Sequence, residues 1–165
     1  MPTGRIEAMR QRLDAMLQAV RTVQPAVEKF YQSLNDEQKA RFNALGVDDD
    51  QPQSARDLAR SCGERAAGIA GLPIDEIERT IGPDDAQRAA LMELRDATGQ
   101  AVDLLKSDCP TYRPLTPVVR LEAMEQRLDA MLRAVQTVEP ALQKFYGALS
   151  DEQKERLNRL PPRAA

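Results

Sequence analysis

An internal duplication constrains the fold of this chain more than any other feature. Residues 5–45 recur at residues 120–160, and 28 of the 41 aligned positions carry the same amino acid. Most of the differences are mild, such as Ile6 against Leu121 and Val27 against Leu142. Because two copies report on one unit, a feature that both copies retain indicates what the unit needs.

Each copy begins with apolar residues spaced alternately three and four positions apart, over about four heptads. This spacing predicts a long amphipathic helix, which at about 1.5 Å per residue is roughly 45 Å long. Leu17, Ala19, Ala26 and Tyr31 widen the apolar stripe enough to contact more than one helix. The spaced positions are Ile6, Met9, Leu13, Met16, Val20, Val23, Val27, Phe30 and Leu34, and then Leu121, Met124, Leu128, Met131, Val135, Val138, Leu142, Phe145 and Leu149.

Both copies contain a proline within this pattern, Pro25 and Pro140. A proline inside a helix removes one backbone hydrogen bond and clashes with the preceding turn, at a cost of about 3 kcal/mol. The apolar spacing nevertheless continues across each proline without a phase break. We therefore expect one kinked helix in each copy rather than two helices.

A capping motif follows each long helix. Asn35 and Ser150 are suited to the N-cap of a second helix, and a glutamine lies three residues later in each case. The acidic residues between them favour the positive end of a helix. We expect short second helices that end near Gly46 and before Pro161. The two motifs read Leu34-Asn35-Asp36-Glu37-Gln38 and Leu149-Ser150-Asp151-Glu152-Gln153.

The segment between the copies predicts further helices. Residues 55–70 and 84–107 have helical spacing, the second range opening on a capping-box spacing from Asp84 to Gln87, and residues 74–81 read as a short helix or turn. Residues 109–117 contain three prolines and indicate a linker. The chain therefore divides into a first repeat (1–46), a middle helical hairpin with its linker (47–117) and a second repeat (118–165). We expect one all-α domain of long kinked amphipathic helices and helical hairpins, or part of a longer tandem array.

Composition argues against several classes of function. The net charge is −3 and no run of Lys or Arg stands out, so we expect no nucleic-acid partner. No stretch approaches the roughly 18 apolar residues of a membrane span, so we expect no membrane insertion. The absence of histidine removes the commonest general base and transition-metal ligand, and we expect no catalytic residue, cofactor or metal. Residues 48–50 are three aspartates, which lack the pattern of a calcium loop and indicate a solvated turn.

The chain contains two cysteines, Cys62 and Cys109. If the two middle helices form an antiparallel hairpin, Cys109 returns toward the first of them, and a disulfide is then geometrically allowed. Two buried thiols that act as small apolar side chains are the alternative. The residues alone do not decide between these interpretations.

The string FY-x-x-L-x-DEQK-x-R-x-N, at residues 30–43 and 145–158, resembles the LTXXQ-motif family of bacterial periplasmic helical proteins, which includes the Spy and CpxP chaperones. Leu34 and Leu149 match the leucine of the motif, and Gln38 and Gln153 match its glutamine. Its threonine is replaced by Asn35 and Ser150, which can also cap a helix. The resemblance implies a Spy/CpxP-like protein of the periplasm, with its signal peptide outside this sequence. The oxidising periplasm in turn favours a Cys62–Cys109 disulfide.

The resemblance implies a chaperone-like or envelope-stress function, in which apolar helix faces bind unfolded protein clients or a protein partner. A structural or adaptor module and an envelope metal-responsive protein are the alternatives. Because the two long helices are so similar, we expect them to pack on each other, within one chain or in a homodimer. We expect the methionines of the spaced apolar positions and the two Phe-Tyr pairs to lie mainly in the core. The alternative is that they bind clients. These residues are Met9, Met16, Phe30, Tyr31, Met124, Met131, Phe145 and Tyr146.

Overall fold

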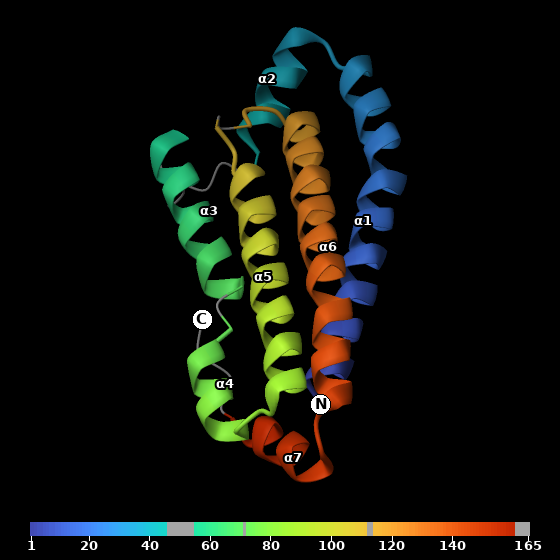
Figure 1. Ribbon diagram of the computed structural model, residues 1–165. Coiled ribbons are helices and arrows are strands. Elements are labelled where there is room, and N and C mark those ends of the chain that lie inside the picture. Colours follow the sequence, from blue (N-terminus) through green and yellow to red (C-terminus); the bar gives the residue numbers. More distant parts are fainter. Residues whose placement is uncertain (46–54, 71, 112–113, 161–165) are drawn as a thin grey trace.

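The computed structural model describes residues 1–45, 55–70, 72–111 and 114–160, and every regular element in these ranges is an α-helix (Figure 1). The all-α prediction is therefore confirmed. The aspartates at 48–50 lie outside the described residues. The helices are α1 (Pro2–Ser33), α2 (Asp36–Ala44), α3 (Ala55–Ala70), α4 (Ile74–Ile81), α5 (Asp85–Ser107), α6 (Pro117–Ala148) and α7 (Asp151–Arg159).

The four longest helices stand side by side in the order α3, α5, α6, α1, and each runs antiparallel to its neighbour (Figure 1). α6 therefore has a long neighbour on both sides, whereas α1 packs mainly on α6. The short helices α4 and α7 meet at one end of this row, and α2 lies at the other end (Figure 1). The second repeat is thus central, and the first repeat lies at the edge.

Both long helices continue through their prolines. α1 spans 32 residues and includes Pro25, and α6 spans 32 residues and includes Pro140. The prediction of one helix in each copy, rather than two, is confirmed.

The two repeats pack on each other within one chain, through equivalent residues. Arg10 pairs with Glu139 at 3.0 Å and Arg21 pairs with Glu125 at 2.9 Å, which holds the antiparallel register. The α6 side of the apolar contact consists of the residues 115 positions after those on the α1 side. The two helices are therefore related by an approximate twofold axis. The buried side chains of this contact are Leu13, Leu17, Leu128 and Leu132.

The heptad pattern predicted the buried face of α1 only in part, because every second predicted position is exposed. Met9 and Met16 are 49% and 43% exposed, and Met124 is 50% exposed, so their expected place in the core is wrong. Met131 is partly buried. The helix is rotated toward Leu17, because leucines at 13 and 17 fit the equivalent pair of α6. Besides Pro2 and Thr3 at its start, the more buried positions of α1 are Ile6, Arg10, Leu13, Leu17, Val20, Gln24, Val27 and Tyr31, and the partly buried Leu34 follows directly after the helix.

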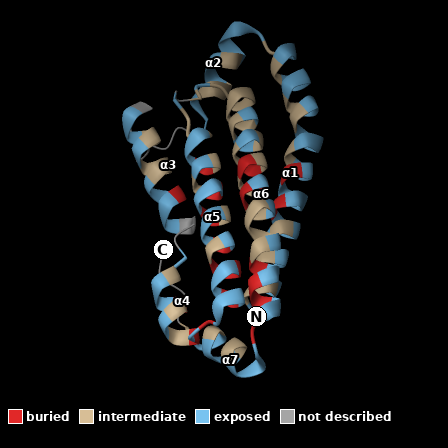
Figure 2. Cartoon of the chain, viewed as in Figure 1, coloured by how far each residue is buried: buried red, intermediate tan, exposed pale blue. Residues whose placement is uncertain are grey.

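The largest core cluster lies where α4, α5 and α6 meet, with α7 packed beside it (Figure 2). Phe145 is 0% exposed there and is surrounded by aliphatic side chains. Burying a phenylalanine of this kind contributes about 1.5–3 kcal/mol. The cluster contains Ile77, Ile81, Ala90, Leu91, Leu94, Leu142, Phe145, Tyr146 and Leu149.

Candidate functional site

Both repeats close their hairpins with the same capping box. In the first, the Gln38 backbone N–H donates to Asn35 Oδ1 (2.9 Å) and the Asn35 N–H donates to Gln38 Oε1 (3.0 Å). In the second, the corresponding bonds between Gln153 and Ser150 measure 3.2 and 2.9 Å. The replacement of asparagine by serine therefore leaves the capping geometry intact, because each side-chain oxygen reaches the same N–H.

A third capping box, at Asp84 and Gln87, opens α5 and pairs with the box of the second repeat. The amide nitrogens of Gln87 and Gln153 each donate to the side-chain oxygen of the other at 2.9 Å. Gln87 Nε2 also lies 2.9 Å from the carbonyl of Ala148. Glutamine spacing indicated a helix start at Asp84, but only the tertiary structure shows that the two boxes bind each other.

The box of the first repeat has no such counterpart in the part of the chain that the structure describes. Gln38 is exposed, whereas Gln153 is partly buried. Leu34 is likewise only half-buried, whereas Leu149 is 4% exposed. Two nearly identical motifs therefore lie in different surroundings, one covered by α4 and α5 and the other open.

The aromatic pairs differ in the same way. Phe145 and Tyr146 are 0% and 8% exposed, so they form core contacts and not the client-binding edge considered for them. Phe30 is 52% exposed, and its ring meets the edge of Phe42 at 5.6 Å between centroids. Tyr31 is partly buried against the same Phe42 ring. Only the first repeat keeps an aromatic side chain open to solvent.

Four exposed apolar side chains follow one face of α1, each seven residues from the next, and we name them the α1 stripe. Their exposed fractions are 43–52%, unusual for large apolar side chains that recur along one line. Figure 2 shows that most of α1 is exposed. The α1 stripe consists of Met9, Met16, Val23 and Phe30.

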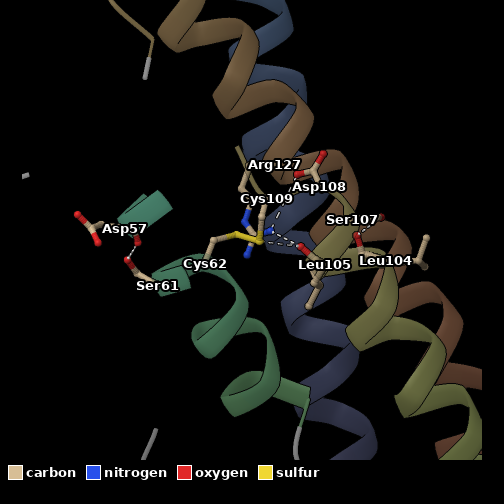
Figure 3. Close-up of a disulfide and its surroundings, with 9 residues drawn as sticks. All are labelled: Asp57, Ser61, Cys62, Leu104, Leu105, Ser107, Asp108, Cys109 and Arg127. Atoms are coloured by element: carbon tan, nitrogen blue, oxygen red, sulfur yellow. Dashed lines mark hydrogen bonds and ion pairs between the residues drawn. A yellow bond between two sulfur atoms is a disulfide. The ribbon is translucent and has the colours of Figure 1, made fainter. Parts of the chain in front are cut away.

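A disulfide joins Cys62 of α3 to Cys109, just after α5, with 5.7 Å between the two Cα atoms (Figure 3). This is the pairing that the family resemblance favoured. Ala66 of α3 packs one turn away against Ala101 and Leu105 of α5. Because α3 contributes one fully buried apolar residue among those described, the disulfide is a main constraint on its position.

Arg127 of α6 connects the end of α5 to the second repeat. Its Nη1 donates to the Leu105 carbonyl at 3.0 Å and lies 4.0 Å from Asp108 (Figure 3). Burial raises the pKa of Asp108, and the positive charges of Arg127 and Arg133 oppose that effect. A cavity of about 610 Å³ lies beside the disulfide and is lined by both polar and apolar residues.

The described residues show neither a metal-ligand cluster nor a membrane span. No group of three or more Cys, Asp or Glu side chains is placed there to hold a metal ion. None of the described helices combines the length and the apolar character that a bilayer crossing requires. The exposed apolar side chains of α1 and the exposed Gln38 box make the open surface of the first repeat the candidate site.

The fold and the paired capping boxes define a class of helical-hairpin protein in which Asx/Ser-x-x-Gln turns close and join the hairpins. The family model for "LTXXQ motif family protein" matches residues 2–46 and 69–161, so the chain belongs to the LTXXQ motif family. This family is associated with periplasmic helical proteins.

The chain is also similar to the protein translocase subunit SecA of Roseiflexus sp. (strain RS-1), with 27% identity across 90% of the chain. It spans only 17% of that protein's length. No solved structure matches the chain significantly.

Proposed function

We propose that this protein is a non-catalytic, chaperone-like protein of the periplasm whose α1 stripe binds apolar segments of partly unfolded protein clients. The observation that carries the proposal is the exposure of four large apolar side chains along one helix face. Membership in a family of periplasmic helical proteins supports the location and the class of function.

The chemistry of the stripe suits varied clients. From Met9 to Phe30 it rises roughly 30 Å along the helix, which matches about nine residues of an extended chain. The flexible, polarisable side chains of Met9 and Met16 adapt to different apolar partners. Phe30 adds a large aromatic contact at one end. Neighbouring charged residues keep this surface soluble between binding events.

Suppression of aggregation of a reduced or heat-denatured model client tests the proposal. The double variant M16S/V23S removes the centre of the stripe, and we expect it to lose most of the suppression. The exposed polar residues Gln11 and Gln32 supply a matched control, Q11S/Q32S, which should retain it. Failure of the wild-type chain with several clients, or equal activity of both variants, would refute the proposal.

The similarity to a translocase subunit covers a small part of that protein, and translocase activity is no part of this proposal. An adaptor function predicts a different result, in which the chain captures one defined partner and leaves unrelated clients to aggregate. The aggregation assay with chemically unrelated clients therefore separates the two functions.

A further inference from the structure

The outer face of α1 carries the same residues with which α6 binds α5. On α6, Ala130, Ala134 and Phe145 are buried at 1%, 5% and 0% exposure, and Ala134 packs against Ala101 and Leu105 of α5. All positions of the equivalent α1 face are exposed. The matched pairs are Ala8 and Ala123, Ala15 and Ala130, Ala19 and Ala134, Ala26 and Ala141, and Phe30 and Phe145.

The polar groups that fix α5 on α6 are also repeated on α1. Lys144 pairs with Glu93 of α5 at 2.7 Å, and Lys29 stands at the equivalent, exposed position of α1. Arg127 donates to the Leu105 carbonyl at the end of α5, and Arg12 is its exposed counterpart. The first repeat therefore presents charges complementary to a helix like α5.

The capping box adds a third, independent match. In the second repeat, Gln87 binds Gln153 and the carbonyl of Ala148. The first repeat keeps Gln38 exposed at the position of Gln153, and Ser33 supplies the equivalent carbonyl. The small residues, the charges and the capping glutamine thus recur on the first repeat in the same arrangement as on the second. In the second repeat this arrangement is in contact with α5 and its capping box.

We propose that the outer face of α1, together with the Gln38 capping box, docks a helical hairpin of the α4–α5 type that belongs to another LTXXQ-type protein. The partner hairpin carries its own Asx-x-x-Gln box, small residues on the long helix and a carboxylate that meets Lys29. A second copy of this chain does not supply this hairpin, because its own α4 and α5 already cover α6 and α7.

This inference rests on the proposed function in one respect, that the α1 stripe binds protein, and it names a specific class of partner. The docked hairpin covers Phe30, as α5 and α4 cover Phe145. Hairpin docking and client binding are therefore competing states of one surface.

A peptide of residues 72–108, which contains α4 and α5, is a direct probe for the full disulfide-bonded chain. The chain's own α4–α5 hairpin is covalently attached and has a higher effective concentration at α6 than the free peptide has. The free peptide therefore binds the first repeat, whose surface is open. We expect saturable one-to-one binding in a calorimetric titration, and protection of α1 and α2 amides from hydrogen exchange. The F30A variant should weaken binding about tenfold or more, because Phe145 is fully buried in the equivalent contact.

Two controls make the result specific. Gln32 is exposed, as is Gly147 at the equivalent position, so Q32A should leave the affinity unchanged. The substitution K29E should weaken binding by about two- to fivefold, and an E93K peptide should restore it, since the pair is solvent-exposed. Circular dichroism and thermal unfolding verify that each variant is folded.

Three outcomes would overturn the inference: no saturable binding, equal binding of a scrambled peptide, or a dimer of the chain that the peptide does not dissociate. The aggregation assay distinguishes this failure from failure of the proposed function. Peptide binding without aggregation suppression retains the hairpin site and refutes the chaperone proposal. Suppression without specific peptide binding retains the chaperone and refutes the hairpin site.

Discussion

One substitution, made at equivalent positions of the two repeats, tests the difference in their surroundings. Phe145 is 0% exposed and Phe30 is 52% exposed, although the flanking sequences are almost the same. Replacing a buried phenylalanine by alanine removes its burial energy and leaves a cavity, which together cost about 3–5 kcal/mol. We expect F145A to lose this amount of unfolding free energy.

F30A should cost far less. Half of the Phe30 side chain already contacts water, so its burial contributes about 1 kcal/mol. Its edge contact with Phe42 adds about 0.5–1 kcal/mol, and an open site leaves no enclosed cavity. The expected total is below about 2 kcal/mol, which leaves a difference of at least about 1 kcal/mol between the variants.

Urea unfolding of the oxidised chain, followed by circular dichroism at 222 nm, measures both values. The midpoint multiplied by the slope gives the free energy, and equal slopes confirm that the variants unfold in the same way. The wild-type chain and Q32A serve as references. Equal losses for F145A and F30A would show that the first repeat is covered in solution, and would refute the assigned exposure.

Three further predictions follow from the disulfide, the capping boxes and Asp108. Cys62→Ser opens a link across 47 residues and should lower the unfolding free energy by about 4 kcal/mol, as measured by denaturant unfolding without reductant; unchanged stability would contradict the assigned bond. In the same assay, Gln153→Ala should lower the unfolding free energy by about 2–3 kcal/mol and Gln38→Ala by about 1 kcal/mol. The reason is that only Gln153 also forms hydrogen bonds with a second capping box. A larger loss for Gln38→Ala than for Gln153→Ala would contradict this. Burial raises the pKa of Asp108 in the folded state, so the folded chain binds its proton more tightly than the unfolded chain. Its stabilising contribution is therefore present below the usual carboxyl pKa and is lost as pH rises through the raised value, and Asp108→Asn should remove this step from a profile of melting temperature against pH. Identical profiles for the two chains would contradict the assigned shift.

Local elements follow closely from the sequence. The capping-box spacing predicted the starts of α2, α5 and α7, because these boxes involve only residues three positions apart. The unbroken apolar spacing across Pro25 predicted a single α1. Each of these features depends on neighbours along the chain, so sequence reasoning had the necessary information.

The face that α1 buries followed only in part from the heptad pattern, whereas the predicted face of α6 is buried or partly buried at every position except Met124. A wide apolar stripe contains two adjacent lines of side chains that could be buried. Both lines fit apolar residues spaced three and four positions apart. Packing on α6 selects the line of Leu13 and Leu17, and this leaves Met9 and Met16 open. The hydrogen bonds between Gln87 and Gln153 could not be predicted from the sequence either, because 66 residues separate the two glutamines.

The sequence by itself determined the helices, their caps, the duplicated unit and its family. Only the tertiary structure decided that the two copies have different environments. The physical reason is that a helix at the centre of a row has two neighbours and a helix at its edge has one, so the same residues are buried in α6 and exposed in α1. The candidate binding surface is a property of position in the fold, since Phe30 and Phe145 have almost the same local sequence.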